Sequence, residues 1–272
     1  MRLLTALFHM FQYLRTAWIW GASAVLVIIW VPLTAFIWVF DGFSDDATRR
    51  RTGQWFRRLG RMVTYIGGWQ ITITGREHIN PNQVYVIVSN HQSLADIPLL
   101  SHLKLNTKWL AKVELFRVPL FGWLMRMAGD VPVDRAAPRQ AARALMQCGK
   151  YLRQNCSVVF FPEGGRSKDG EVQPFNEGAF QLALREHVPI LPVVVEGTGK
   201  ALPSQSWLWG NSRDIQLRVL NPVSAEGWGA KGGGALRDAV RQKIVDELSR
   251  MRASAREGAA CGVSGQGVGS SV

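Results

Sequence analysis

The feature that most constrains this chain is a run of 24 residues without a charged side chain, from Ala17 to Phe40. At about 1.5 Å per residue, a helix of this length can cross a hydrocarbon core about 30 Å thick. A cleaved signal peptide is disfavoured, because the apolar run is too long and no small-residue cleavage site closes it before Asp41. We therefore predict a hydrophobic, helical membrane anchor over residues 1–43.

Two arrangements of this anchor fit the sequence. Pro32 can kink the run, and residues 3–14 are themselves largely apolar. One spanning helix and two helices lying in one leaflet are therefore both open. Amphipathic rings suit a membrane interface, and six tryptophans occur within the first 69 residues: Trp18, Trp20, Trp30, Trp38, Trp55 and Trp69.

A cluster of arginines follows the apolar run: Arg49, Arg50, Arg51, Arg57, Arg58 and Arg61. Apolar residues lie at helical spacing on the other face, at Trp55, Leu59, Met62, Val63 and Ile66. We predict a basic amphipathic helix at the membrane interface over residues 44–68, with anionic lipids as partners. The arginines also fit a positive-inside topology signal. Both interpretations place the remaining chain on the cytoplasmic side of the cell inner membrane or of another cytoplasm-facing membrane.

The overall charge is positive, with 32 lysines and arginines against 20 aspartates and glutamates. Such a surface attracts phosphates, anionic headgroups or nucleic acid, and the charge alone does not choose among them. A nucleic-acid binder would not need a 24-residue apolar anchor, so we predict no nucleic-acid partner. The three cysteines, Cys148, Cys156 and Cys261, lack C-x-x-C spacing, so neither a disulfide framework nor a metal site is predicted.

After Gly68, short β-type runs alternate with helical stretches, which predicts a single α/β layered domain over residues 69–252. Its expected sheet is mixed, largely parallel and flanked by helices. Strands are expected at residues 71–74, 84–88, 131–133, 158–161, 193–195 and 215–219, and helices at 94–103, 138–154, 178–187 and 236–252. Residues 84–88 and 158–161 are apolar throughout and are expected to be central, whereas residues 71–74 alternate and suit an edge. Residues 253–272 have almost no charge and are predicted to form a flexible tail.

A histidine and an aspartate follow the second expected strand, in the stretch Ser89-Asn90-His91-Gln92-Ser93-Leu94-Ala95-Asp96. On one regular helix these two residues would point about 140° apart. If His91 lies in the turn and Asp96 in the first helical turn, the carboxylate can reach the imidazole, as a general base acting on a hydroxyl requires. The alternative is a capping box in which Asp96 only holds a helix start.

A glycine-rich, basic loop follows the strand at residues 158–161, with the sequence Pro162-Glu163-Gly164-Gly165-Arg166-Ser167-Lys168. Paired glycines let backbone N–H groups converge on an anion, and Arg166 offers a planar fork for phosphate. An ordinary Gly-Gly turn is the alternative. Two further stretches could add phosphate contacts: Lys108 to Lys112, and Gly129 to Arg135, where the arginine follows the expected strand at residues 131–133. Taken alone, each stretch also fits ordinary surface charge.

Together these residues resemble the lysophosphatidic acid acyltransferase family, the 1-acyl-sn-glycerol-3-phosphate acyltransferases. Four blocks match in order over about residues 85–195: Asn90-His91 through Asp96, Gly129 through Arg135, Phe161 through Ser167, and Val188 through Val195. Four ordered blocks make a chance match improbable. One departure is Gly165, where the family usually carries threonine, which leaves the acceptor headgroup open.

The resemblance implies that His91 deprotonates the acceptor hydroxyl, Asp96 orients His91, and the hydroxyl attacks a donor thioester directly. It also implies that Glu163 and Gly164 position the acceptor or the developing oxyanion. Arg166, Arg135 and Lys112 would bind the acceptor phosphate. No cofactor is implied beyond the donor substrate, which is acyl-CoA or acyl carrier protein, and lysophosphatidic acid is the expected acceptor.

Other classes of function fit less well. A lipid hydrolase lacks support, since the sequence has no G-x-S-x-G elbow and no H-E-x-x-H motif. A noncatalytic basic membrane-binding protein accounts for the anchor and the arginines, but gives no reason for His91 and Asp96 beside a phosphate loop. Within the acyltransferase interpretation, lyso-ornithine lipid or another lysophospholipid is an alternative acceptor.

Overall fold

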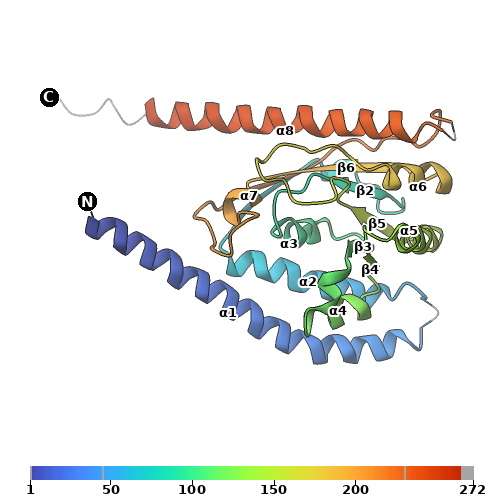
Figure 1. Ribbon diagram of the computed structural model, residues 1–272, viewed down its shortest axis with the longest axis horizontal. Coiled ribbons are helices and arrows are strands. Elements are labelled where there is room, and N and C mark those ends of the chain that lie inside the picture. Colours follow the sequence, from blue (N-terminus) through green and yellow to red (C-terminus); the bar gives the residue numbers. More distant parts are fainter. Residues whose placement is uncertain (1, 45, 230, 265–272) are drawn as a thin grey trace.

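The computed structural model describes residues 2–44, 46–229 and 231–264, and its centre is a seven-stranded sheet (Figure 1). The strands run in the spatial order β1-β7-β6-β2-β5-β3-β4. Their bounds are β1 (Gln70–Thr74), β2 (Val86–Ser89), β3 (Thr107–Lys112), β4 (Val131–Val133), β5 (Ser157–Phe160), β6 (Ile190–Glu196) and β7 (Asp214–Val219). All neighbouring strands pair in parallel except β6 and β7, which are antiparallel. The predicted mixed, largely parallel sheet is confirmed.

Helices connect and cover the strands. The α-helices are α1 (Arg2–Asp41), α2 (Arg50–Ile66), α3 (Asp96–Leu100), α4 (Phe121–Met127), α5 (Pro138–Arg153), α6 (Gly178–Glu186), α7 (Thr198–Ala201) and α8 (Gly233–Ser264). Short 3₁₀ helices are η1 (Arg76–His78), η2 (Ser101–Leu103) and η3 (Val113–Arg117). In Figure 1, α5, α6 and α8 lie on one side of the sheet, and α3, α2 and α1 lie on the other.

Two apolar layers fix the sheet between these helices. Val86 and Val88 of β2 face a core shared with α5, α6 and α8, while Ile87, between them, faces the opposite core with α3. Because successive strand side chains point to opposite faces, a strand apolar at every position must be covered on both sides. The burial of every residue in β2 and β5 confirms their expected central place. β1 is an edge strand, as its alternating pattern predicted.

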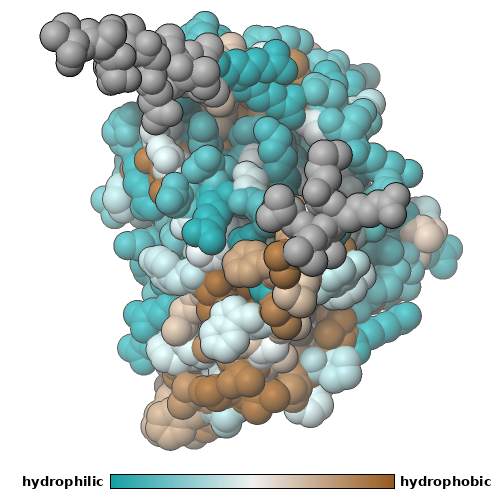
Figure 2. Space-filling model, turned by 90° about the vertical axis from the view of Figure 1, so that its left-hand side faces the viewer, coloured by the Kyte–Doolittle hydropathy of each residue, from teal (hydrophilic) through white to brown (hydrophobic). Residues whose placement is uncertain are grey.

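The N-terminal helix α1 packs along the domain by one stripe of side chains. Ile19 and Trp30 are buried, and Trp30 stacks on Trp55 of α2 with ring centroids 4.9 Å apart. The opposite stripe is apolar yet exposed, with Trp18 at 68% and Phe36 at 64% of their accessible areas. Figure 2 shows hydrophobic residues gathered over the lower part of the molecule, where α1 lies in Figure 1. Within the described chain, Leu7–Asp41 is the one segment long and apolar enough to cross a membrane.

Helix α2 lies between α1 and the rest of the domain, so part of its basic face is turned inward. Arg57 is buried and forms an ion pair with Asp130, while its guanidinium lies 4.6 Å from the centre of the Trp109 ring. Arg61 donates to the carbonyl of Ser101. Arg50, Arg51 and Arg58 remain exposed. Only part of the arginine cluster is therefore available to lipid.

Three elements differ from the sequence predictions. β3 was not predicted, because lysines at both ends of the segment suggested an exposed surface. In the structure, Lys108 is fully buried and donates to the carbonyl of Ala128. β6 begins at Ile190, before Pro192, whose carbonyl accepts a hydrogen bond from Leu220 N–H. The predicted tail is wrong for residues 253–264, which continue α8, since the segment contains helix-favouring alanine and no proline. Residues 265–272 of that predicted tail lie outside the described residues.

Candidate active site

The carboxyl ends of β6, β2, β5, β3 and β4 meet at one edge of the sheet, which we call the carboxyl edge. Ligands of open α/β sheets bind outside this edge. β2 is held there by Asn90, whose side-chain amide both donates to the carbonyl of Val195 and accepts from the N–H of Val195, each at 2.9 Å. Asn90 thus extends the pairing of β2 with β6 by one residue and fixes where His91 begins its turn.

His91 lies in that turn and is held at several points. Its N–H donates to Glu163 Oε1 at 2.6 Å, and its carbonyl accepts from Ser167 N–H at 2.8 Å. Its Nδ1 lies 2.7 Å from Asp96 Oδ2, and its ring stacks on Phe161 with centroids 4.0 Å apart. Within the described chain, Nε2 makes no hydrogen bond. An imidazole that donates Nδ1–H to a carboxylate leaves Nε2 as the nitrogen that can accept a proton.

Asp96 is fully buried at the start of α3, and one of its oxygens serves three donors. Oδ2 accepts from the N–H groups of Gln92 at 2.7 Å and Ser93 at 2.9 Å, in addition to His91. The fold-back of Asp96 onto His91 is therefore present, and the same carboxylate also holds the backbone before the helix. The reciprocal half of a capping box is absent, because Ser93 Oγ accepts from Ala95 N–H and not from Asp96 N–H.

Glu163 braces the histidine turn against the loop after β5. Its two oxygens accept from the N–H groups of His91 and of Gln173, at 2.6 and 3.0 Å. Desolvation raises the pKa of Glu163 from 4.5 to about 7, more than these two donors lower it. Both oxygens have backbone partners, so the geometry gives Glu163 a positioning role toward His91, where the resemblance implied contact with the acceptor.

Gly164 and Gly165 have different places in this loop. Gly164 has φ +78° and its N–H donates to the carbonyl of Phe161, so it serves the turn itself. A Cβ at Gly164 would lie 3.0 Å from Asn176 Nδ2, whereas one at Gly165 would meet nothing within 4 Å. Within the described chain, the N–H groups of Gly165 and Arg166 make no hydrogen bond. These two, rather than Gly164 N–H, are the donors available to an anionic substrate atom.

The three predicted phosphate-binding residues come from three neighbouring strands. Lys112 ends β3, Arg135 follows β4, and Arg166 lies in the loop after β5. Arg135 Nη1 would be 3.7 Å from a Cβ at Gly164, which places its guanidinium against the glycine loop, and burial lowers the pKa of Arg135. Lys112 forms an ion pair at 3.2 Å with Glu114, with both side chains more than half exposed, so this pair costs little to break. Arg166 is exposed and makes no ion pair with the described residues.

Several supporting residues were not found by sequence reasoning. Phe161 stacks on His91, and Ser167 N–H binds the histidine carbonyl. Gln92 bridges to Glu196 at the end of β6. Of these supporting residues, only Asn90 could have been found from the sequence. A side-chain amide just after a strand can donate and accept hydrogen bonds as the backbone of a paired strand does. No group of three potential metal ligands occurs among the described residues.

A buried carboxylate holds a histidine whose second nitrogen makes no hydrogen bond with the described residues, beside a basic loop. This arrangement is typical of enzymes that activate a hydroxyl near an anionic group. Comparison with known proteins agrees with this class. Residues 70–196 match the family model described as Acyltransferase. The chain resembles the crystal structure of the 1-acyl-sn-glycerophosphate (LPA) acyltransferase PlsC from Thermotoga maritima, with a TM-score of 0.76 and 25% identity. The match covers 90% of this chain and 98% of the Thermotoga maritima chain.

Sequence relatives give the family. The chain is 34% identical over 231 residues to a chloroplastic 1-acyl-sn-glycerol-3-phosphate acyltransferase of Brassica napus, covering 84% of this chain and 64% of the relative. It is 32% identical to a 1-acyl-sn-glycerol-3-phosphate acyltransferase of Limnanthes douglasii, and the match covers 79% of this chain and 71% of the relative. The chain belongs to the 1-acyl-sn-glycerol-3-phosphate acyltransferase family. It spans a little under two thirds of the length of the Brassica napus relative.

Proposed function

We propose that this protein transfers a fatty acyl group from a thioester to the sn-2 hydroxyl of 1-acyl-sn-glycerol 3-phosphate, which yields phosphatidic acid for phospholipid synthesis. The observation that carries the proposal is the 2.7 Å contact between His91 Nδ1 and the buried Asp96 carboxylate. That contact leaves Nε2 to take a proton, and it lies at the carboxyl edge, beside the loop of Arg166.

The reaction needs one base and no covalent enzyme intermediate. His91 Nε2 accepts the hydroxyl proton as the acceptor oxygen attacks the thioester carbonyl carbon. The N–H groups of Gly165 and Arg166 can donate hydrogen bonds to the oxyanion that forms and so stabilise it. When it collapses, the carbon–sulfur bond breaks and the leaving thiolate takes the proton from the imidazolium. The products are the diacyl lipid and a free thiol.

The acceptor phosphate is assigned to the basic groups along the carboxyl edge. Arg166 provides a bidentate donor fork, and Arg135 lies against the same glycine loop. Lys112, whose exposed pair with Glu114 costs little to break, is the third group assigned to the phosphate. Lysophosphatidic acid carries a terminal phosphate that suits this set. No cofactor is proposed, and the donor is acyl-CoA or acyl carrier protein.

Gly165 supports a second candidate class of acceptor lipid. The space beside this residue is open, since a Cβ there would meet nothing within 4 Å. A lyso-lipid with a larger headgroup, such as lyso-ornithine lipid or another lysophospholipid, could occupy it. The chemistry at His91 would be the same for either acceptor.

Membrane binding is proposed to occur through α1 lying in one leaflet. Both halves of this helix are tied to the domain: Arg15 donates to the carbonyls of Gly210 and Gly67, and Asp41 accepts from Thr52. A spanning α1 would draw those partners into hydrocarbon, where irregular backbone is costly. The exposed Arg50, Arg51 and Arg58 would meet anionic lipids, with the domain on the cytoplasmic side of the cell inner membrane or of another cytoplasm-facing membrane.

An acceptor panel tests the proposal. Full-length protein in detergent is offered labelled acyl-CoA or acyl carrier protein with lysophosphatidic acid, lyso-ornithine lipid and other lysophospholipids, beside the variant Gly165→Thr. We expect the highest kcat/KM with lysophosphatidic acid. Gly165→Thr should fold normally, because the site has room for the side chain, and should favour this acceptor further through its added hydroxyl. Transfer only to a larger headgroup would move the substrate assignment, and transfer to none would refute the function.

A further inference from the structure

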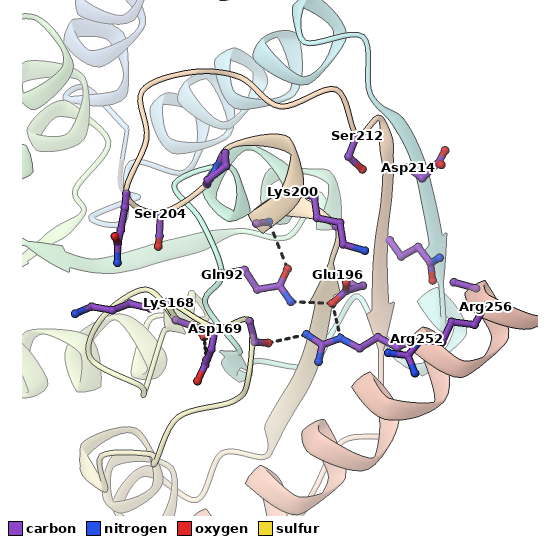
Figure 3. A pocket seen from close by; sticks show the side chains of 18 residues that line it. Gln92, Lys168, Asp169, Glu196, Lys200, Ser204, Ser212, Asp214, Arg252 and Arg256 are labelled. Carbon is purple, nitrogen blue, oxygen red and sulfur yellow. Dashed lines mark hydrogen bonds and ion pairs between the residues drawn. The ribbon is translucent and has the colours of Figure 1, made fainter. Parts of the chain in front are cut away.

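The backbone and the ring of His91 are held in different ways. The turn is tied to β6 by polar contacts, because the side-chain amide of Gln92 donates to Glu196 at 2.8 Å, as a dashed line in Figure 3 shows. The imidazole itself makes one hydrogen bond within the described chain, from Nδ1 to Asp96. One hydrogen bond leaves a ring free to tilt about the bonded atom, so packing must set the plane of the imidazole.

Phe161 supplies that packing. Its ring stacks on the imidazole of His91, with centroids 4.0 Å apart and planes 21° apart. In the parallel pair of β2 and β5, Ile87 lies opposite Val159, so the chain just beyond Val159 runs beside the start of the histidine turn. Phe161 precedes Pro162, which confines it to extended backbone, so its side chain lies on the same face of the sheet as that of Val159. The strand register therefore brings Phe161 onto the histidine ring.

Phe161 follows the last residue of β5 and is only partly buried, so its place depends on its neighbours. Trp109 of β3 is one of them, with ring centroids 6.4 Å apart in an edge-on arrangement. This separation is within the range of favourable aromatic pairs. Trp109 lies opposite Val159 in the sheet, is 5% exposed, and belongs to the core cluster on which Phe161 packs. Phe161 therefore contacts both the reacting histidine and a buried tryptophan.

Trp109 is in turn fixed by three groups. Its indole N–H donates to Thr107 Oγ1 at 3.1 Å, and its backbone N–H donates to Asp130 Oδ1 at 3.0 Å. The guanidinium of Arg57, from α2, lies 4.6 Å from the centre of the Trp109 ring and forms an ion pair with the same Asp130. Attraction between a cation and an indole face is strongest when both are removed from water. A rotation of the indole would break its hydrogen bond and this cation contact together.

From these contacts we infer that Trp109 is a positioning residue for acyl transfer, which acts on the plane of the His91 ring through Phe161. The inference rests on the proposed function, in which His91 Nε2 takes the hydroxyl proton. As the proton arrives, the imidazole becomes a cation, and the face of Phe161 attracts it. An imidazole tilted away from the acceptor hydroxyl would leave both substrates bound as before but would slow the proton transfer.

Steady-state kinetics of the full-length protein in detergent test the inference. Trp109→Leu should lower kcat by about tenfold or more, while KM for lysophosphatidic acid changes by less than about twofold. Trp109→Phe keeps an aromatic ring and should recover most of the kcat. Trp69→Leu is the matched control, because Trp69 is a buried tryptophan of the same core cluster whose ring contacts Trp209. It should keep kcat within about twofold of wild type, and a loss as large as that of Trp109→Leu would overturn the inference.

A double-mutant cycle on kcat tests the route through Phe161. If Trp109 acts on His91 through that ring, Trp109→Leu should lower kcat by less than about twofold further in a Phe161→Leu protein. The two substitutions would then be strongly non-additive. Independent, multiplying losses of kcat would overturn the inference while leaving acyl transfer intact.

Nuclear magnetic resonance of the histidine ring tests the positioning without turnover. An aromatic face shifts the signals of protons that lie over it, so the Cε1–H signal of His91, identified by its loss in His91→Gln, reports the stacking on Phe161. Trp109→Leu should move this signal, and so should Thr107→Val, a milder change that removes only the acceptor of the indole N–H. Trp69→Leu should leave it in place.

Thr107→Val keeps this comparison available if Trp109→Leu does not fold. A His91 signal that stays in place in the folded Trp109 and Thr107 variants would overturn the inference. A signal that moves with Trp109, in a protein that acylates no acceptor, would support the positioning and refute the proposed function.

Discussion

At His91, both backbone groups and one ring nitrogen are already bound, and the ring rests on Phe161. This arrangement orders the imidazole before any substrate arrives, so little reorganisation remains for the proton transfer. Asp96 contributes through a single oxygen that also serves two backbone donors. A residue with both tasks is costly to replace, because its loss frees the base and also leaves buried N–H groups unpaired.

Glu163 gives a pH-dependent prediction at the same scale. Its pKa is raised to about 7 by burial, from 4.5. The native state therefore holds this proton more tightly than the unfolded chain, so the stabilisation is full below pH 4.5 and is lost as the pH rises toward about 7. Glu163→Gln has no such titration. The unfolding free energy of wild type minus that of Glu163→Gln should fall across this window in urea denaturation, and a constant difference would contradict the assignment.

Among the elements, α8 has a role that its position outside the matched residues 70–196 does not suggest. Arg241 donates to the carbonyls of Val172 and Gln173, at 2.6 and 3.1 Å, and Arg252 donates to that of Gly170 at 2.7 Å. The two arginines are eleven positions apart, about three helical turns, and so lie on one face of α8. They hold the loop that also carries Glu163 and Arg166.

Arg241→Gln should therefore lower kcat more than it raises KM for the acceptor, since it loosens the loop that orders His91. Loss of these bonds should also reduce the unfolding free energy by about 1–3 kcal/mol. Arg241→Lys keeps the charge and should recover part of the kcat. Parallel kinetics and urea unfolding measure both effects, and a variant with reduced stability but wild-type kcat would show that the loop does not depend on α8.

Elements that have a clear local hydrophobic pattern could be predicted from the sequence. Elements whose burial depends on residues far away in the sequence could not. The central strands followed from their apolar runs. The sequence offered the fold-back of Asp96 onto His91 as one of two alternatives, and the 2.7 Å contact shows that it is present. β3 could not be predicted, because the burial of Lys108 depends on the carbonyl of Ala128, twenty positions away. In α2, the inward turn of Arg57 depends likewise on Asp130. The roles of Glu163 and Arg241 depend on loop packing, which no local pattern encodes.

For the whole molecule, the proposed membrane-binding surface is the exposed apolar stripe of α1. Trp18 and Phe36 lie on that stripe, away from the domain. Trp18→Glu with Phe36→Glu should weaken sedimentation with anionic vesicles by more than about tenfold, because interfacial binding scales with buried apolar area. Met146→Glu, at an apolar site on α5 that is also exposed, should bind vesicles as wild type does. Equal binding by all three proteins would exclude α1 as the membrane-binding surface.

The most direct test of the account is the rate of acyl transfer by His91→Gln, which keeps a side chain of similar size but cannot take a proton. With lysophosphatidic acid and a saturating thioester donor, the initial rate should fall by about 10²-fold to 10⁴-fold while the unfolding midpoint stays near that of wild type. His78→Gln, whose imidazole bonds only to the carbonyl of Val219 among the described residues, should remain active. A folded His91→Gln protein that keeps its rate within about twofold of wild type would contradict the assignment of His91 as the general base.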